Sequence, residues 1–271
     1  MLNNLNKEIT YQSFGGGPPS VALLILNCQG IIQPKATVII FADPGSEDPK
    51  TYELLPVYQK YAEQYNIPFI TVSAKEGKLY DYIWNRSTPI PIYTSTGGLG
   101  HRQCTRQWKV YPINSYLRKE LGASHINAQL GMTWEEVWRM RDSPVKYVTN
   151  VYPLIDIRIR REECIALIKK AELPVPPRSA CIFCPFKSQE AWQEMAIHNP
   201  ETFKEAVRLE ERINARQDSK GKLPVYLTNR KRPLGQLGET WRKQKDLIQQ
   251  LNLIPSKNEE DWRCESGHCF T

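Results

Sequence analysis

Residues 13–20 read S-F-G-G-G-P-P-S and separate two apolar stretches, E-I-T-Y-Q at 8–12 and V-A-L-L-I-L at 21–26. The first stretch alternates polar and apolar residues and predicts a β-strand, whereas the second predicts a buried helix. Glycines permit positive φ angles and let a ligand approach the main chain closely. Prolines at the first helical positions cost little, because the amides they lack would have no helical partner. The stretch therefore predicts a helix N-terminus with exposed amides, which favours an anion.

The alternation of strand and helix signals continues through the first half of the chain. Strands are expected at 8–14, 36–42, 67–73 and 125–131, and helices at 18–26, 49–65, 106–121 and 133–140. Strands that alternate with helices imply an α/β fold with a mostly parallel sheet flanked by helices. Ligands of such sheets bind at the carboxyl ends of the strands, which is where the glycines lie.

The sequence changes character near residue 174, where L-P-V-P-P-R-S-A-C-I-F-C-P-F begins an irregular, proline-rich stretch. Amphipathic helices are expected after it, at 189–198, 200–213 and 238–251. We therefore expect an α/β domain over 1–173 and a cysteine-containing helical extension over 174–271, packed on that domain.

Composition limits the class of protein. The formal net charge of +7 favours anionic partners such as nucleotides or nucleic acid. No apolar run is long enough to cross a membrane, and the N-terminal M-L-N-N-L-N-K-E lacks the apolar core of a signal peptide. A cytoplasmic protein without a membrane partner is expected. Seven cysteines in such a protein indicate reduced thiols, metal ligands or catalysis rather than disulfides.

The cysteines fall into two groups. Cys28 and Cys164 lie in apolar helical patterns and are expected to be buried packing residues. The others lie among polar, proline, glycine or arginine residues: Cys104, Cys181, Cys184, Cys264 and Cys269. The C-x-x-C spacing at 181–184 lets both thiolates turn toward one metal ion or cluster, although a redox pair also fits. The last two either complete a four-ligand site or form a tail with a reactive thiol.

Polar residues at 43–47 follow the strand expected at 36–42. The stretch F-A-D-P-G-S-E places Asp43 and Glu47 on the same edge of the sheet as the glycines. Two carboxylates there could hold ribose hydroxyls or a metal ion. The alternative is a capped turn, in which Asp43 and Ser46 satisfy backbone amides.

Four stretches in this order resemble the phosphoadenosine phosphosulfate (PAPS) reductase family: S-F-G-G-G-P-P-S, F-A-D-P-G-S-E-D-P-K-T-Y-E, C-T-R-Q-W-K-V-Y-P-I and C-I-F-C-P-F. The family motifs read S-G-G-x-D-S, F-x-D-T-G-x-x-x-x-E-T-Y, C-C-x-x-R-K-x-x-P-L and C-x-x-C. The family belongs to the PP-loop ATP pyrophosphatases, or adenine nucleotide α-hydrolases, and the resemblance implies their Rossmann-like (HUP-type) fold. It covers residues 8 to about 190.

Carried over by position, the resemblance implies a site for ATP or PAPS. The residues implied to bind the phosphates are Ser13, Gly15, Gly16, Gly17 and Ser20. Those implied to lie beside the nucleotide are Asp43, Gly45 and Glu47. Pro19 stands where the family has an aspartate that coordinates Mg²⁺, so this carboxylate ligand is missing.

The resemblance also implies a 4Fe-4S cluster, with zinc as the alternative metal. The implied ligands are Cys104, Cys181, Cys184 and, as the fourth, Cys264, although Cys269 or an external sulfur could replace the fourth. Gln103 stands where cluster-bearing reductases have a second cysteine. Sulfur-transfer members of the group use an open fourth iron site. The implied catalytic residues are Arg106 and Lys109, which offer positive charge, and Cys269 as the nucleophile of a poorly matching tail.

Two functions are consistent with these patterns. The first is an enzyme that reduces PAPS or transfers sulfur in an ATP-dependent reaction, with a thiol or sulfur-donor protein as partner. The second is a binding protein that keeps the nucleotide fold and a structural zinc. Basic stretches at 229–235 and 241–245 could bind nucleic acid such as a tRNA acceptor, or be solvated faces. The sequence names neither the acceptor, the electron donor nor the oligomeric state.

Overall fold

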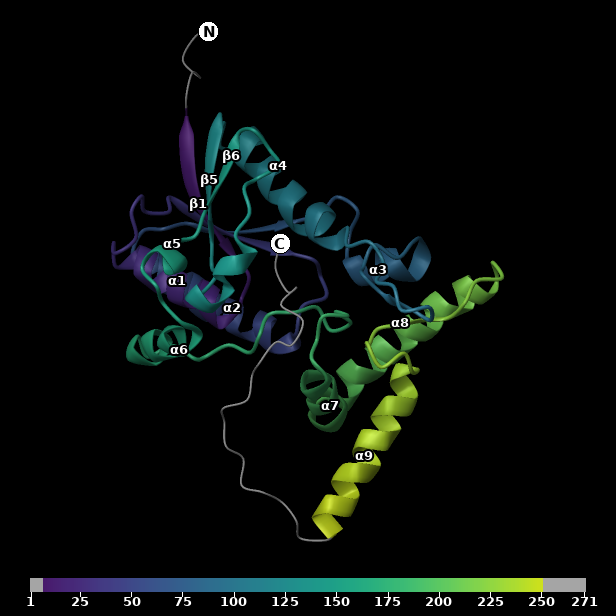
Figure 1. Cartoon of the computed structure of the whole chain (residues 1–271). Helices are drawn as coiled ribbons and strands as arrows, with labels where there is room; N and C mark the ends of the chain where they lie inside the picture. The colour runs from purple at the N-terminus through teal and green to yellow at the C-terminus, as the bar shows by residue number, and fades with distance from the viewer. Residues whose placement is uncertain (1–6, 251–271) are drawn as a thin grey trace. The chain divides into compact units, whose positions relative to one another are not determined.

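The structure is a computed structural model that describes residues 7–250 (Figure 1). The expected tail ligands Cys264 and Cys269 lie outside the described residues. The chain divides into two compact units. The first contains the described residues up to Lys78 together with Thr105–Ser179, and the second contains Leu79–Cys104 and the residues from Ala180 onward. The first unit is therefore formed by two stretches of the chain, and the stretch between them, Leu79–Cys104, belongs to the second unit.

The first unit contains a five-stranded sheet with the order β3-β2-β1-β5-β6, in which all neighbouring strands are parallel. Its strands are β1 (Glu8–Phe14), β2 (Val38–Asp43), β3 (Phe69–Ser73), β5 (His125–Leu130) and β6 (Val148–Val151). The α/β, Rossmann-like fold is confirmed, and β6 is the strand that the sequence pattern missed. The order reverses between β1 and β5, and ligands of open α/β sheets bind at such a reversal.

Helices cover both faces of this sheet: α1 (Pro18–Cys28), α2 (Pro49–Gln64), α4 (Tyr111–Lys119), α5 (Pro153–Asp156) and α6 (Arg161–Lys170). Alternate residues of β2 face opposite cores. Phe41 packs in a core with residues of α1, α2 and α6, whereas Ile40 packs on the other face with Ile113 of α4. Every residue of α1 is buried, because α5 and α6 cover the side that faces away from the sheet. This explains its uninterrupted apolar sequence.

Two expected helices differ from their regular form. The stretch 106–121 begins with a π-helical turn, η1 (Arg106–Val110), before α4, and Pro112 lies in the first turn of α4. Trp108 in the π turn is fully buried, and its indole N–H donates to the carbonyl of Gly77 at 2.8 Å. The stretch 133–140 forms a 3-10 helix, η2 (Trp134–Arg139). A π turn is rare and often marks a functional segment.

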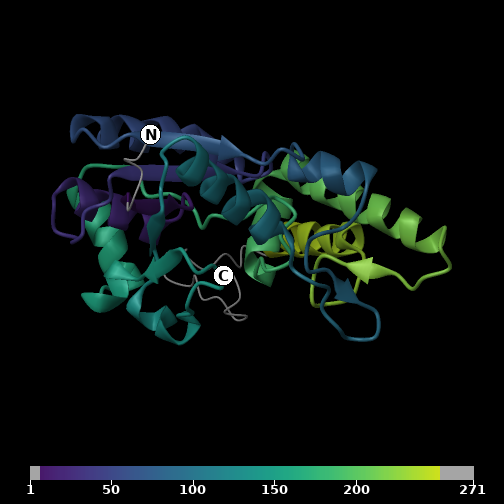
Figure 2. The ribbon, with the colours of Figure 1, turned by 90° about the horizontal axis from the view of Figure 1, so that it is seen from above.

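The second unit contains α3 (Leu79–Asn85), α7 (Gln189–His198), α8 (Pro200–Asp218), α9 (Leu234–Gln250) and a two-stranded antiparallel sheet of β4 (Tyr93–Thr94) and β7 (Val225–Tyr226). Figure 2 shows this pair of strands as two short arrows. The helices α7, α8 and α9 pack on one another around Trp192, Phe203 and Trp241. The helix α9 begins at Leu234 rather than at 238 and contains Gly238, where a Cβ would overlap the Phe203 ring.

Between residues 7 and 250, no helix combines the length and the apolar character needed to span a bilayer.

Candidate functional site

The glycine loop, residues 15–17, joins β1 to α1 at the strand-order reversal. Gly17 is the N-cap of α1, and its carbonyl accepts from the amides of Ser20 and Val21 at 3.0 and 3.1 Å. Pro18 and Pro19 have no N–H to offer. In the described part of the chain, the amides of Gly16 and Gly17 have no hydrogen-bond partner. The donors available at this terminus therefore come from the glycines and not from the first helical turn.

The two serines expected at the phosphates lie in different surroundings. Ser20 is buried, and its hydroxyl donates to the Gly17 carbonyl at 2.8 Å, so it is hydrogen-bonded within the first helical turn. Ser13 is half-buried near the end of β1, where it pairs with β2 and β5.

Thr51 contacts the glycine loop from the first turn of α2. A Cβ on Gly16, whose φ is +81°, would lie 2.7 Å from Cγ2 of Thr51. The Thr51 side chain is 2% exposed, and its Oγ1 has no hydrogen-bond partner among the described residues. Because buried polar atoms are nearly always hydrogen-bonded, this hydroxyl is a candidate contact for a bound ligand or water. The N-termini of α1 and α2 thus meet around Gly16.

The end of β5 is also fitted to the loop. A Cβ on Gly131 would lie 3.0 Å from Cα and 3.1 Å from N of Ser20, so no side chain fits between β5 and the start of α1. Gly131 belongs to none of the motifs recognised in the sequence. Its only signal is a glycine directly after the strand at 125–130, at the sheet edge where ligands bind.

Three buried amide side chains connect β1, α1 and β5 below the loop. The Asn27 amide donates to Oε1 of Gln12 at 3.1 Å and to Oε1 of Gln129 at 2.7 Å. Gln12 in turn donates to the carbonyl of Ser20 at 2.6 Å, and Asn27 Oδ1 accepts from the amide of Ala36. These three side chains are fully buried, and a satisfied polar network of this kind fixes one arrangement of its elements. It holds α1 in position at the strand-order reversal.

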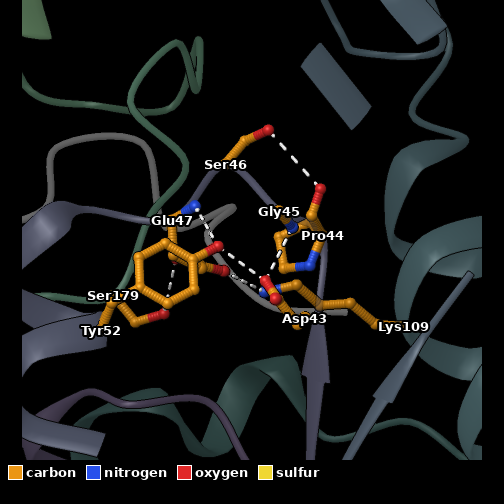
Figure 3. A network of polar contacts seen from close by, with 8 residues as sticks. All are labelled: Asp43, Pro44, Gly45, Ser46, Glu47, Tyr52, Lys109 and Ser179. Atoms are coloured by element: carbon orange, nitrogen blue, oxygen red, sulfur yellow. Dashed lines mark hydrogen bonds and ion pairs between the residues drawn. The ribbon is translucent and has the colours of Figure 1, made fainter. Parts of the chain in front are cut away.

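Asp43 is part of a polar network at the end of β2 (Figure 3). Its Oδ1 accepts from the amide of Gly45 at 2.7 Å and from the Tyr52 hydroxyl at 2.6 Å. Burial and then the bond to Asp43 raise the pKa of Tyr52, so the phenol keeps its proton. Gly45 has a φ of +67°, which the turn requires. The capped-turn interpretation therefore describes one oxygen of Asp43, and the Ser46 hydroxyl donates to the Pro44 carbonyl.

The side chain of Glu47 is fully buried and has one cationic and one hydroxyl partner (Figure 3). Its Oε1 lies 2.8 Å from Nζ of Lys109, and its Oε2 accepts from the hydroxyl of Ser179 at 3.3 Å. The backbone amide of Glu47 donates to the Tyr52 oxygen at 3.1 Å. This ion pair connects the β2 edge to the π turn. The charge of Lys109 is thus already balanced by a carboxylate.

Ser179 reaches the glycine loop as well as Glu47. A Cβ on Gly17 would lie 3.4 Å from the amide nitrogen of Ser179. Ser179 is 3% exposed and ends the first unit. The sequence analysis treated its surroundings only as an irregular stretch, because nothing local indicates that it packs beside a loop more than 160 residues earlier in the chain.

Cys104, Cys181 and Cys184 all belong to the second unit. The amide of Cys184 donates to the carbonyl of Cys181 at 3.0 Å, so the C-x-x-C stretch is a turn. Burial raises the pKa of the Cys184 thiol, and the charge of Cys104 raises it further. Cys104 therefore lies within electrostatic reach of Cys184 although 80 residues separate them in the chain.

Positive groups partly offset this effect. Lys187 and Arg102 lower the pKa of Cys184, as does a hydrogen bond to the backbone of Phe186. The Arg102 guanidinium lies over the Phe186 ring, 5.4 Å from its centroid. Within residues 7–250, no three side chains of His, Cys, Asp or Glu are arranged to hold a single metal ion. Cys184 thus has cationic neighbours, but the described cysteines do not form a site for a single metal ion.

The remaining candidate residues are placed as follows. Arg106 is exposed in the π turn, and its guanidinium lies 5.2 Å from the centroid of the Tyr111 ring. Cys28 and Cys164 are buried in helices of the first unit, as predicted for packing residues.

No protein-family model matches the chain. Among curated proteins it is similar to ORF290, an uncharacterized nin region protein of Escherichia phage lambda, with 25% identity over 203 residues, 67% of this chain and 67% of that protein. Among solved structures it is similar to the U34-tRNA thiolase NcsA from Methanococcus maripaludis with its 4Fe-4S cluster, with a TM-score of 0.42 and 14% identity over 94% of this chain and 75% of that chain. Similarities at this level establish neither a family nor a function for this chain.

Proposed function

We propose that the chain is an enzyme that binds an adenine nucleotide, ATP or PAPS, at the glycine loop and handles sulfur with Cys104, Cys181 and Cys184. The observation that carries the nucleotide site is the buried, unpartnered hydroxyl of Thr51 beside the unpartnered amides of Gly16 and Gly17. Amides, a hydroxyl and two helix N-termini are the groups that bind phosphate without a positively charged side chain.

The polyanion would be held mainly by the main chain. The N-termini of α1 and α2 each carry partial positive charge, and both helices begin beside Gly16. Pro19 supplies no carboxylate for Mg²⁺. Main-chain amides and cationic side chains would therefore balance more of the negative charge of the phosphates. Lys109 is shared with Glu47, which leaves the exposed Arg106 as the cation of the C-T-R-Q-W-K stretch that can move toward a phosphate or sulfur oxyanion.

Asp43 is the group that we assign to the ribose. Its Oδ1 is held by Gly45 and Tyr52, whereas its Oδ2 makes no hydrogen bond to another described residue. A carboxylate at the end of β2, next to the strand that carries the glycine loop, is placed as in other doubly wound nucleotide-binding sheets. Fixing one oxygen orients the other, which favours binding of a hydroxyl pair.

The three thiols are ligands of the type that binds a four-iron cluster. In a cluster each thiolate binds a different iron atom, so the thiols are spaced more widely than the ligands of one shared ion. The positive charges of Arg102 and Lys187 near Cys184 would stabilise thiolates and a negatively charged cluster. A bound cluster would supply an iron site for a sulfur atom in sulfur transfer, whereas in sulfonucleotide reduction the Cys269 thiol and an external thiol donor would supply the two electrons and end as a disulfide. The fourth cluster ligand stays assigned to Cys264.

The residues of the nucleotide edge and the cysteines lie on neighbouring positions of the chain. Ser179, which contacts Glu47, precedes Cys181 by two residues, and Arg106 follows Cys104 by two residues. Both segments that bring thiols into the second unit are therefore direct continuations of segments that form the nucleotide edge of the first unit. In the proposal the sulfur chemistry acts on the nucleotide that the first unit binds.

Binding and turnover test the nucleotide part. The full chain should bind ATP or PAPS in equilibrium dialysis and should release pyrophosphate from ATP or sulfite from PAPS with a thiol donor. Pyrophosphate would assign ATP-dependent sulfur transfer, and sulfite would assign reduction. If neither nucleotide binds, the nucleotide part of the proposal is wrong.

Anaerobic purification tests the cysteine part. The protein should be brown, with iron, acid-labile sulfide and broad absorbance near 400 nm, as expected for cysteine-bound clusters. The single variants C104S, C181S and C184S should each lose most of the iron, whereas C28A should keep it, because Cys28 lies in the first unit. Colourless protein with one zinc ion would favour the binding protein over the enzyme.

A further inference from the structure

The second unit contains a pocket of about 240 Å³ that the proposed function does not use. By volume it could hold about eight water molecules, which is close to the small end of ligand sites in proteins. Its walls come from β4, the turn after Cys184, the start of α7, the segment after β7, and α9. The lining residues are Tyr93, Pro185, Phe186, Lys187, Ser188, Gln189, Trp192, Thr228, Asn229, Arg230 and Trp241.

Two buried polar atoms in this lining have no hydrogen-bond partner. Nε1 of Trp192 and Oγ1 of Thr228 are both fully covered, in side chains that are 1% and 4% exposed. In the described residues only one further side-chain atom, Oγ1 of Thr51, shares this condition. An indole N–H can only donate, and a buried donor left unpaired is costly. These two atoms therefore indicate a missing ligand with hydrogen-bond acceptors.

The charges of the lining are of one sign. Lys187 and Arg230 are both cationic, and the lining contains no aspartate or glutamate. The Arg230 guanidinium is held by Oε1 of Gln189, to which its Nε donates at 2.6 Å. Gln189 thus orients Arg230 without neutralising it. The lining favours an anionic ligand.

The walls are also unusually aromatic. Trp192 and Trp241 both pack edge-on against Phe203, with ring centroids 6.4 and 6.3 Å apart and interplanar angles of 80° and 67°. Gly238 lets α9 approach Phe203, because any Cβ there would overlap the ring. The two indoles are therefore held by a rigid frame, and Phe186 and Tyr93 complete an aromatic lining. Flat aromatic surfaces next to cations are the elements with which proteins bind nucleobases and their phosphates.

We propose that this pocket binds a single nucleotide, with its base against the aromatic walls and its phosphate near Lys187 and Arg230. The basic stretches at 229–235 and 241–245 acquire a specific role in this way, because they contribute Asn229, Arg230 and Trp241 to the lining. A carboxylate metabolite would explain the cations but not the aromatic walls. The site lies wholly in the second unit and is independent of the glycine loop.

The test titrates the full chain, labelled with ¹⁵N-tryptophan, with the four nucleoside monophosphates and with a ten-nucleotide single-stranded RNA. Substitution Trp192→Phe identifies the indole resonance of Trp192, which should shift when a nucleotide binds. Thr228→Val should weaken binding about tenfold, the effect of one lost hydrogen bond. Lys187→Gln should weaken it and reduce the slope of log affinity against log salt by about 1.

Matched controls keep these effects specific. Thr240→Val and Lys222→Gln change the same residue types at exposed positions outside the lining and should leave affinity unchanged. The titrations are repeated in the Thr51→Val protein, in which binding at the glycine loop should be about tenfold weaker whereas the shift of the Trp192 indole should be unchanged. Equal affinity for monophosphates and RNA would identify a free nucleotide as the ligand. Tighter binding of RNA would identify a nucleotide within a strand as the ligand. An unshifted Trp192 indole, or wild-type affinity in Thr228→Val, overturns the proposal.

Discussion

A Cβ atom on Gly16 would lie 2.7 Å from Cγ2 of Thr51, so the glycine loop and the first turn of α2 are fitted to each other without space for one methyl group. Gly16 also has a φ of +81°. Both features require glycine, and together they bring an unpartnered hydroxyl next to unpartnered amides. The loop after β1 is therefore defined as much by α2 as by its own three glycines.

The fit at Gly16 predicts a large effect of a small substitution. Gly30→Ala, which introduces a side chain at a φ of +72° into open space, should lose about 1–2 kcal/mol of unfolding free energy. Gly16→Ala carries the same backbone strain and should lose about 1–3 kcal/mol more, because Thr51 must move. Denaturant unfolding of both variants measures the difference, and equal losses would show that Thr51 gives way easily.

Thr51→Val should separate stability from ligand binding. Without ligand, removal of an unpaired buried hydroxyl should leave the unfolding free energy unchanged or raise it by up to about 1 kcal/mol. Affinity for ATP or PAPS should fall about tenfold, the effect of one hydrogen bond to phosphate. Thr37→Val, at an exposed position of the same unit, is the control and should bind normally. Normal binding by Thr51→Val would remove this hydroxyl from the site.

Lys109→Met should destabilise the first unit. It leaves the fully buried carboxylate of Glu47 with only the Ser179 hydroxyl, and an unpaired buried charge costs about 3 kcal/mol or more. The control is Lys50→Met, which breaks a pair whose side chains are 52% and 65% exposed and should cost at most about 0.5 kcal/mol. Denaturant unfolding of the two variants measures these losses of unfolding free energy. Similar losses would show that Glu47 finds another partner.

Glu210 predicts a pH dependence of stability in the second unit. Burial raises its pKa from 4.5 to about 7, although its carboxylate accepts from the amides of Leu227 and Leu234. Between these values the folded chain keeps a proton that the unfolded chain has released, so stability falls as pH rises. The difference in unfolding free energy between wild type and Glu210→Gln should decrease by up to about 3 kcal/mol from pH 4.5 to 7.5. A difference that stays constant contradicts the raised pKa.

Cys28 and Cys164 should not react with alkylating reagents in the folded protein. Burial raises the pKa of Cys28 and of Cys164 to about 12, so almost no thiolate is present at pH 8. In metal-free native protein, iodoacetamide at pH 8 should modify the half-exposed Cys104 and spare both buried thiols, whereas all three should react in denaturant. Peptide mass spectrometry measures each site. Modification of Cys28 at the rate of Cys104 would mean that the first unit opens frequently.

Sequence patterns predicted the first unit well where they were long and periodic. The strands at 8–14 and 125–131 and the helices at 18–26 and 49–65 lie within a few residues of β1, β5, α1 and α2. The strand β6 was missed, because V-T-N-V is short and partly polar and acquires its hydrogen bonds only from β5. The π turn was missed for a similar reason: Trp108 is drawn into the core by contacts that no local pattern encodes.

The features of the candidate site likewise fall into those that depend on local sequence and those that depend on tertiary packing. That residues 15–17 form a loop before a helix with proline at its start follows from the backbone preferences of glycine and proline, which depend only on immediate neighbours. That Asp43 caps its own turn was one of two interpretations open from the sequence. That Glu47 pairs with Lys109, 62 residues away, was not foreseen, because it needs β2 and the π turn to be packed first.

The sequence by itself thus determined the fold class, the glycine loop at the sheet edge and the burial of Cys28 and Cys164, because these depend on periodicity and local backbone geometry. Only the tertiary structure decided that Thr51 and Gly131 close around the loop, that Cys104 lies near Cys184, and that Trp192 and Thr228 share a pocket. The physical reason is that each of these relationships joins segments distant in the chain, and such contacts form only where whole helices and strands pack together.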